Sequence, residues 1–430
     1  MKSNAFENHV LRHLHTLLMR TGLLLVFGLT AGLQTSAAQE WTILHGGVPY
    51  WTHALTSYNG DVVAGGESPG YLRRWDGFTW MPIGGGVDGQ VNALTVYNGE
   101  LIAAGSFFTA SGLEVGYIAK WDGTQWLDLE GGANSIITSL AVYNGFLIAG
   151  GYFTSCNGPA NYIAQWDGHN WDPLGSGMNS QVMALTVYGT DLIACGFFTT
   201  AGGLPANHIA KWDGTNWSAL GSGIAWITYA LTVHNGELIA GGLFSQAGDV
   251  PARRVASWNG ATWSALGGGL GGGPYGYVLA LCSYNGRLVA GGIFNDADGH
   301  PAQHIAQWDG SAWTPMGAFY GGGSTCAVYA LMPYGAQCLA GGIFYGNVSV
   351  WNEPNAGPAP VQDLTVSAAG ADVVLSWTPT GAVSYRVYSD TNPYGPHVTL
   401  LGTTSNGTWT DFGAADLVAA RFYQVRSFNP

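Results

Sequence analysis

Short apolar runs separated by turn residues recur along most of this chain. One stretch shows the pattern clearly, with a run on each side of Asn235-Gly236 and another on each side of Asn259-Gly260. The runs are roughly 4–7 residues long, which is typical of β-strands and too short for helices. Asn-Gly accommodates the positive φ of a two-residue type I′ turn, so each pair predicts a hairpin. In most other stretches Asp-Gly replaces the second Asn-Gly and predicts the same turn.

The four runs belong to a repeated unit. The motif W-D-G-x-x-W begins at Trp75, Trp121, Trp166, Trp212 and Trp308, with W-N-G-x-x-W at Trp258 and a shortened copy at Trp351. The first tryptophans are 46, 45, 46, 46, 50 and 43 residues apart. A period in this range indicates a repeated supersecondary unit. Four short strands in about 45 residues predict a propeller blade.

The unit resembles the Kelch-type propeller family. Ile239-Ala-Gly-Gly242 matches that family's hydrophobic strand ending in Gly-Gly, and Trp258 and Trp263 match its aromatic positions in the third and fourth strands. The chain differs in using Trp-Asp-Gly where the family usually has a Tyr-Asp-Pro-type turn. The resemblance implies an all-β, seven-bladed β-propeller over residues 39–352.

The two ends of the repeat array predict how the ring closes. The segment 40–47 resembles the fourth strand of a complete unit, such as 216–223. The last unit, 326–352, has three runs and is followed by the three prolines of 353–360, which cannot continue a strand ladder. We therefore expect the N-terminal strand to complete the last blade and remove an open sheet edge.

The segments on either side of the repeats differ from them in composition and hydrophobic pattern. Residues 1–38 contain basic residues, the apolar run 22–29 and Ser36-Ala37-Ala38, as in a secretory signal peptide. Residues 353–360 form a Pro-rich linker. Residues 361–430 alternate with period two, and their Trp377, 384–388 and 422–428 resemble a fibronectin type III domain. We expect this domain to space or attach the propeller.

Composition narrows the range of partners. The chain has 13 Lys and Arg, 26 Asp and Glu, and a net charge of −13 at pH 7. So few cations argue against nucleic acid and anionic membranes as partners, and no apolar run after the signal is long enough to span a membrane. The five cysteines lack C-x-x-C spacing. We interpret them mainly as buried small residues, with one disulfide possible but not assignable.

Three kinds of site chemistry find little support in these repeats. The aspartates of W-D-G occur once per unit and are interpreted as turn formers rather than ligands. Sialidase chemistry needs a cluster of three arginines, and copper-oxidase chemistry needs a Tyr, His and Cys constellation; the sequence shows neither. Asp296 and Asp298 resemble the start of a calcium loop but lack its bidentate Glu, so they are a weak calcium candidate. We expect no cofactor, no metal and no catalytic group.

Non-repeating residues near the channel mouth are the candidate binding site. Trp51 and Trp226 are the two tryptophans outside the repeated positions and the C-terminal domain. The variable position before each Ala-Leu pair adds further candidates, and His208 and His304 share an equivalent position with a repeated structural role. The candidates are Trp51, His53, Asn92, His208, Trp226, Tyr229, His304 and Tyr329.

These patterns favour a secreted or cell-envelope, non-catalytic protein that binds an extracellular protein or glycan. One alternative is a secreted carbohydrate-active enzyme with a site at the channel mouth, which needs two carboxylates about 5–9.5 Å apart. A structural surface-layer or matrix component is another.

Ring closure by the N-terminal strand is directly testable. Deleting residues 39–47 should lower the melting temperature sharply, because the last blade loses its fourth strand. Thermal unfolding followed by circular dichroism measures this. A melting curve identical to that of the intact chain would refute the closure.

Overall fold

The computed structural model describes residues 40–44, 46–67, 72–77, 79–272, 276–319, 326–335, 337–352, 365–369, 372–376, 384–390, 399–406, 408–411 and 422–428. The chain divides into two compact units, of which the first covers residues 37–354 and the second contains residues 355–430. Strands β1–β37 belong to the first unit and β38–β43 to the second. The expected signal peptide and Pro-rich linker lie outside the described residues. Within those residues, no helix has the length and apolar character needed to cross a membrane.

The first unit contains seven four-stranded antiparallel sheets among its described residues. Sheet 1 consists of β2 (Thr52–Tyr58), β3 (Asp61–Gly66), β4 (Leu72–Trp75) and β5 (Trp80–Pro82). Sheet 2 consists of β6 (Val91–Tyr97), β7 (Glu100–Gly105), β10 (Ile118–Trp121) and β11 (Trp126–Leu127). Sheet 3 consists of β12 (Ile137–Tyr143), β13 (Phe146–Gly151), β14 (Ile163–Trp166) and β15 (Trp171–Pro173). Sheet 4 consists of β16 (Val182–Tyr188), β17 (Asp191–Gly196), β20 (Ile209–Trp212) and β21 (Trp217–Ala219).

The remaining sheets follow the same order. Sheet 5 consists of β22 (Thr228–His234), β23 (Glu237–Gly242), β26 (Val255–Trp258) and β27 (Trp263–Ala265). Sheet 6 consists of β29 (Tyr277–Tyr284), β30 (Arg287–Ile293), β33 (Ile305–Trp308) and β34 (Trp313–Pro315). Sheet 7 consists of β35 (Ala327–Tyr334), β36 (Gln337–Ile343), β37 (Val348–Asn352) and β1 (Glu40–Ile43).

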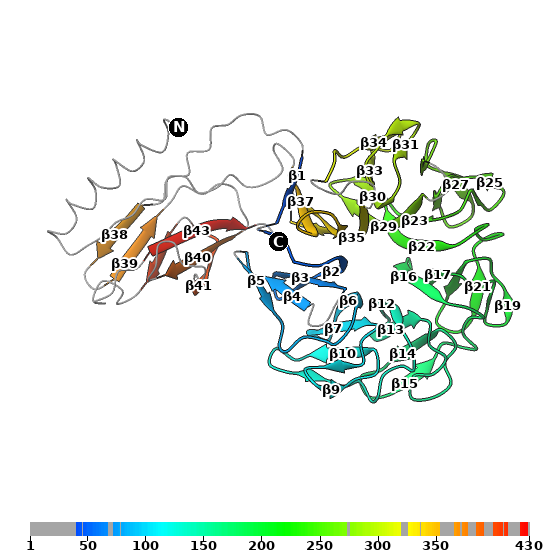
Figure 1. Cartoon of the computed structure of the whole chain (residues 1–430), viewed down its shortest axis with the longest axis horizontal. Helices are drawn as coiled ribbons and strands as arrows, with labels where there is room; N and C mark the ends of the chain where they lie inside the picture. Colours follow the sequence, from blue (N-terminus) through cyan, green and yellow to red (C-terminus); the bar gives the residue numbers. More distant parts are fainter. Residues whose placement is uncertain are drawn as a thin grey trace. The chain divides into compact units, whose positions relative to one another are not determined.

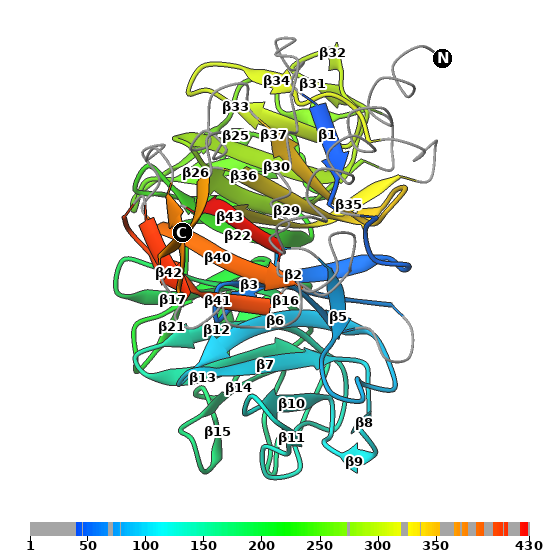
Figure 2. The same cartoon turned by 90° about the vertical axis from the view of Figure 1, so that its left-hand side faces the viewer.

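Sheet 7 joins the two ends of the repeat array. Its fourth strand, β1, pairs antiparallel with β37, as the sequence predicts, and Trp41 lies opposite Trp351. Figures 1 and 2 show β1 beside β37 from two directions. The pairing covers the edge of β37 that would otherwise present unpaired backbone groups.

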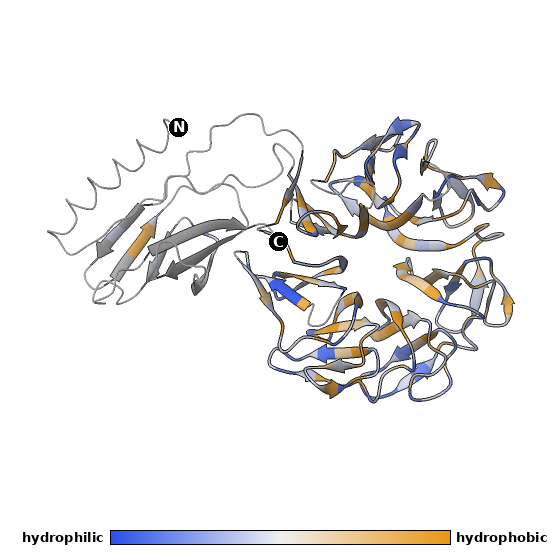
Figure 3. Cartoon of the chain, in the orientation of Figure 1, coloured by the Kyte–Doolittle hydropathy of each residue, from blue (hydrophilic) through white to orange (hydrophobic). Residues whose placement is uncertain are grey.

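The seven sheets form a closed circle. The first strands of successive sheets contact one another from β2 to β35, and β35 in turn contacts β2. Figure 1 shows these first strands toward the centre of the circle. Each second strand is almost wholly buried between neighbouring sheets, which explains its continuous apolar run. Figure 3 shows the hydrophobic residues concentrated on the strands.

The Gly-Gly pairs that end most second strands permit this close packing. A Cβ on Gly150 would lie 2.6 Å from Cγ1 of Val182 in the next sheet. A Cβ on Gly151 would meet the backbone of Ile136, which precedes β12 in the same sheet. Any larger residue would therefore push apart either two sheets or two strands.

The two kinds of hairpin turn differ from each other. The Asn-Gly turns have positive φ at both residues, for example 49° at Asn235 and 81° at Gly236, as a type I′ turn requires. The two-residue turn predicted at Asp-Gly is wrong. Trp121 pairs directly with Trp126, so the turn holds four residues, and of Asp122 and Gly123 only the glycine has positive φ.

The aspartate nevertheless forms the turn. Asp122 Oδ1 accepts hydrogen bonds from the backbone N–H groups of Gln125 and Thr124, at 2.8 and 2.7 Å. These bonds lower the pKa of Asp122 to about 2. Asp167, Asp213 and Asp309 accept the equivalent bonds. The interpretation of the W-D-G aspartates as turn formers is confirmed.

The tryptophans of the repeat connect the sheets. In each sheet the two repeat tryptophans pack against each other with ring centroids 5.3–5.8 Å apart, and Trp41 completes the seventh pair with Trp351. The fourth-strand tryptophan also donates its indole N–H to a carbonyl just past the fourth strand of the preceding sheet, at 2.8–3.4 Å. The donor and acceptor pairs are Trp80 and Leu44, Trp126 and Ile83, Trp171 and Leu129, Trp217 and Leu174, Trp263 and Leu220, Trp313 and Leu266, and Trp41 and Met316.

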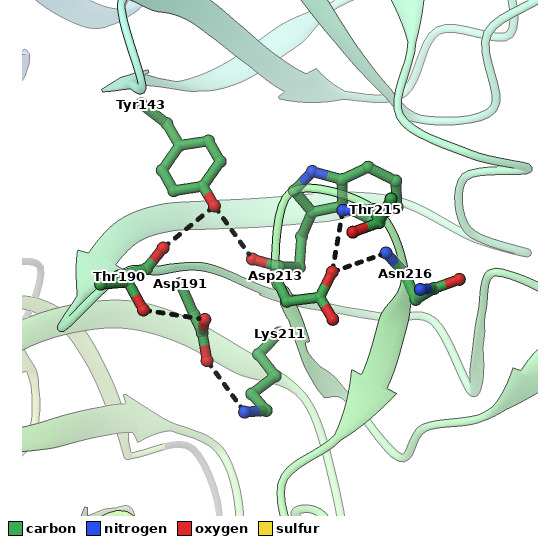
Figure 4. A network of polar contacts seen from close by, with 8 residues as sticks. Tyr143, Thr190, Asp191, Lys211, Asp213, Thr215 and Asn216 are labelled. Atoms are coloured by element: carbon green, nitrogen blue, oxygen red, sulfur yellow. Dashed lines mark hydrogen bonds and ion pairs between the residues drawn. The ribbon is translucent and has the colours of Figure 1, made fainter.

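A second set of contacts between sheets lies at the Asn-Gly end. Tyr143, the last residue of β12, donates its hydroxyl to the carbonyl of Thr190 in sheet 4 at 3.0 Å. Figure 4 shows this bond beside the ion pair of Lys211 with Asp191, whose Nζ–Oδ2 distance is 2.9 Å. Tyr334 makes the equivalent bond from sheet 7 to Gly60 of sheet 1 at 3.0 Å. The circle is thus also joined at this end.

Small hairpins between second and third strands were not predicted. They are formed by β8 (Thr109–Ala110) with β9 (Leu113–Glu114), β18 (Thr200–Ala201) with β19 (Leu204–Pro205), β24 (Gln246–Ala247) with β25 (Val250–Pro251), and β31 (Asp296–Ala297) with β32 (His300–Pro301). Strand β28 (Leu270–Gly271) pairs with β31.

The second unit has two three-stranded antiparallel sheets in its described part. One contains β38 (Thr365–Ala369), β39 (Asp372–Ser376) and β42 (Thr408–Asp411). The other contains β41 (Thr399–Thr404), β40 (Ser384–Asp390) and β43 (Phe422–Phe428). Leu375 is buried.

The indole bonds predict a graded loss of stability. Trp217→Phe removes the donor from a 2.9 Å bond and leaves the carbonyl of Leu174 buried without it. Trp126→Phe is a matched control because Trp126 is equally buried but its bond is 3.4 Å long. Chemical denaturation should show Trp217→Phe to be the more destabilising by about 1 kcal/mol. Equal losses would mean that packing alone holds these rings.

Candidate functional site

Every first strand contains a β-bulge near its start. In sheet 1, Thr52 pairs with Gly66 and Ala54 pairs with Gly65, so His53 is the extra residue. The bulge recurs in all seven sheets. The extra residues are His53, Asn92, Thr138, Met183, Tyr229, Leu279 and Tyr329. These are the variable positions before each Ala-Leu pair or its equivalent, and all seven are half-buried.

The bulge residues lie at one end of the sheets, which we call the mouth. In an antiparallel meander, the connections from strand two to three and from strand four to the next first strand share one end, opposite the Asn-Gly turns. Several bulge side chains reach the neighbouring sheet. Asn92 Nδ2 donates to the carbonyl of Ile137 at 3.1 Å, and His53 stacks on Tyr329 with centroids 4.5 Å apart. The bulges thus line the inner rim of the mouth.

An aromatic cluster spans sheets 4, 5 and 6 at the mouth. Tyr229 makes edge contacts with Phe197 and Tyr277, each with centroids 6.1 Å apart. The rings of Trp226 and His208 are 6.2 Å apart. We call these five residues the aromatic cluster. The side chain of Trp226 is 54% exposed, whereas the other four are half-buried.

The structure therefore brings the candidates Trp226 and His208 together, and it places the candidate Tyr229 against Phe197 and Tyr277. Sequence reasoning missed Phe197 and Tyr277. Phe197 follows Gly196, the last residue of β17, and this position varies from sheet to sheet. Tyr152 occupies it in sheet 3, is 38% exposed and is electrostatically coupled to Tyr229. Variation at the position after the last glycine of the second strand was the signal that could have found Phe197.

Trp51 lies elsewhere on the mouth. It precedes sheet 1, whereas Trp226 precedes sheet 5, so sheets 2–4 separate them on one side and sheets 6 and 7 on the other. Trp51 is 45% exposed and borders a small hollow that is also lined by Tyr50 and Arg73. The candidates thus form separate groups around the rim.

His208 and His304 occupy a repeated backbone position. Both have positive φ, at 62° and 66°, and both accept a hydrogen bond from the last glycine of the second strand. The same conformation occurs at Tyr117, Tyr162, Arg254 and Asn347. Positive φ is uncommon for residues other than glycine, so its recurrence here shows that the backbone conformation of this loop position is part of the repeat. The repeated structural role is confirmed, and His304 directly precedes β33 of sheet 6.

Burial shifts the pKa values of histidine and tyrosine side chains at the mouth. It lowers the pKa of His53 to about 4, so this imidazole is neutral at pH 7. Burial likewise lowers the pKa values of His208 and His304. It raises the pKa of Tyr229, with smaller contributions from Tyr277 and Tyr152. The aromatic cluster is therefore uncharged at neutral pH.

The weak calcium candidates are both bound to protein donors. Asp296 Oδ1 pairs with Arg253 Nη1 at 2.7 Å. The Asp298 carboxylate accepts the backbone N–H groups of Gly268 and Trp313, each at 2.6 Å. These contacts give the two aspartates a structural role. Over the described part of the chain, no group of three or more His, Cys, Asp or Glu is arranged to hold a metal ion.

No protein-family model and no curated protein matches the chain. Among solved structures, it is similar to the extracellular domain of a hybrid two-component system from B. thetaiotaomicron, with TM-score 0.50 and 8% identity, covering 85% of this chain and 47% of that one. PorZ, a surface component of the type-IX secretion system of Porphyromonas gingivalis, gives TM-score 0.49 and 13% identity, covering 90% and 59%. A catalytically inactive virginiamycin B lyase from Staphylococcus aureus gives 0.48 and 11%, covering 73% and 100%.

These similarities concern the fold. Across its described residues the chain is all-β, and seven of its sheets form a propeller-like circle. The similar solved structures named above include extracellular or cell-surface domains and one lyase. The chain spans about half the length of the two-component-system domain and three fifths of the PorZ chain.

The lowered pKa of the half-buried His53 predicts acid sensitivity. Its pKa of about 4 in the folded state lies below the ordinary 6.5. Protonation therefore favours the unfolded chain, so the stabilisation is complete above pH ~6.5 and is lost as the pH falls towards 4. His53→Phe keeps a ring against Tyr329 but cannot be protonated.

Urea denaturation at pH 7.5 and pH 4.5 tests this. The wild-type chain should lose about 2 kcal/mol more than His53→Phe on acidification. The difference between the two chains excludes the other titrating groups, which they share. Equal losses would show that His53 is readily protonated in the folded chain.

Proposed function

We propose that this chain is a secreted or cell-envelope binding protein built on a seven-bladed β-propeller of the Kelch type. The seven tryptophan pairs and the seven-sheet circle support this architecture. The two three-stranded sheets of the second unit support a fibronectin type III-like β-sandwich that spaces or attaches the propeller. The basic and apolar segment at residues 1–38 supports export.

The aromatic cluster is the binding site in this proposal. It is the observation that carries the function, because a group of three rings and a pair of rings, from three sheets, lie at a face where the scaffold varies. Tryptophan and tyrosine supply large contact area at little conformational cost, and they dominate the energetics of binding surfaces. The exposed Trp226 is the principal contact.

A glycan is the ligand that this cluster suits best. The rings of Trp226, Tyr229 and Tyr277 offer apolar faces for the C–H faces of sugars, and the phenol and imidazole groups offer hydrogen bonds to hydroxyls. Glycoside hydrolysis generally uses two carboxyl groups, which none of these five side chains provides, so the role proposed for the cluster is binding. An uncharged extended sugar chain therefore fits it better than a charged partner does.

Glycan-array binding of the intact exported chain tests the proposal. Trp226→Ala should weaken the affinity for any glycan detected by about tenfold or more, since a central tryptophan contact contributes at least ~1.4 kcal/mol. Trp51→Ala is the matched control, because Trp51 is similarly exposed in the equivalent connection of a different sheet. It should leave the affinity within about twofold.

Each other outcome would revise the proposal. If Trp226→Ala left the glycan affinity unchanged, the mouth at sheets 4–6 would not be the binding face. Binding to a protein on pull-down, with no glycan bound, would replace the glycan by a protein partner.

A further inference from the structure

Two cysteines meet at the interface between sheets 6 and 7. Cys282 lies in β29 of sheet 6 and Cys338 lies in β36 of sheet 7, and their Sγ atoms are 3.9 Å apart. Both side chains are buried. They belong to the hydrophobic cluster that also contains Trp41 of the closing strand β1.

Each of the seven interfaces between sheets has a pair of positions equivalent to Cys282 and Cys338. Both are cysteine only at the interface of sheets 6 and 7. The equivalent pairs at the other six interfaces combine Thr, Ala or Met on a first strand with Leu or Val on the next second strand. They are Thr56 with Leu101, Thr95 with Leu147, Ala141 with Leu192, Thr186 with Leu238, Thr232 with Leu288, and Met332 with Val62. Residues other than cysteine therefore fill these positions at the other interfaces, so packing alone does not require cysteine.

We propose that Cys282 and Cys338 form a disulfide that cross-links sheets 6 and 7 in the exported protein. A disulfide needs its sulfurs about 2.05 Å apart, so the two Sγ atoms must each move toward the other by roughly 1 Å. This proposal does not depend on the nature of the ligand at the mouth.

The oxidant is a low-molecular-weight or protein disulfide of an oxidising compartment. The thiolate of one cysteine attacks a sulfur of this disulfide, forming a mixed disulfide and releasing one thiol. The second cysteine then attacks the mixed disulfide, the Cys282–Cys338 bond forms, and the second thiol leaves. Two electrons and two protons pass from the cysteine pair to the oxidant.

The cross-link forms before the circle is complete. Thiolates are the reactive species, and the neighbouring Cys282 thiol together with burial raises the pKa of Cys338 well above its ordinary value in the closed ring. Exchange is therefore fast while sheet 7 is still docking and slow once β1 has closed it. The cross-link then holds sheet 7 beside sheet 6 while the N-terminal strand adds.

Refolding with oxidised and reduced glutathione, followed by alkylation and non-reducing peptide mapping, tests the proposal. A peptide linking Cys282 to Cys338 is expected, with Cys156, Cys195 and Cys326 alkylated. The cross-linked chain should melt about 5–10 °C above the same chain refolded in dithiothreitol. The reduced chain, once folded, should react with oxidised glutathione far more slowly than during refolding.

Two variants complete the test. Cys282→Ser should abolish both the linked peptide and the difference in melting temperature, whereas Cys156→Ser, at a buried cysteine elsewhere, should retain both. Peptide mapping of the wild-type chain decides the matter even if Cys282→Ser folds poorly. Alkylation of both Cys282 and Cys338 after oxidative refolding, or a link from either to Cys326, would overturn the proposal.

Discussion

The hydrogen bond from each fourth-strand indole to the preceding sheet is the constraint on which this architecture depends. A buried carbonyl requires a donor, and in this chain the donor always comes from the next sheet round the circle. In an open row of sheets, the carbonyl at one end would lack a donor and the indole N–H at the other end would lack an acceptor. Trp41 of sheet 7 donates to sheet 6, and Trp80 of sheet 1 donates to sheet 7. Strand β1 therefore completes both the packing and the hydrogen bonding of the circle. Stability is therefore shared around the ring.

Much of this could be predicted from the sequence, because the tryptophan motif and the Asn-Gly turns encode local structure at every repeat. The pairing of β1 with β37 follows from a strand missing at one end and an extra strand at the other. The Asp-Gly turn was misjudged because turn composition does not show register. Opposite placement of Trp121 and Trp126 leaves four residues between them. Two-residue strands such as β18 have no periodicity to detect.

The candidate site was only partly predictable, for a geometric reason. Variation against a constant repeat identified Tyr229 and His53 as special, and both are bulge residues. Trp51 and Trp226 were grouped because both are tryptophans outside the repeated positions, although four sheet interfaces lie between them by one path. Residue type alone does not show which side chains meet at the rim. Tyr277 was missed because an aromatic residue at the start of an apolar run is also what a strand requires.

The bulge in each first strand has a consequence for how such a surface diversifies. Because the extra residue stands outside the ladder, exchanging its side chain leaves the pairing on either side of it in step. Side-chain identity and strand register are thereby uncoupled at this position. A lineage, or a designer working with randomised libraries at these seven positions, can therefore vary the inner rim of the mouth while the strands keep the same register.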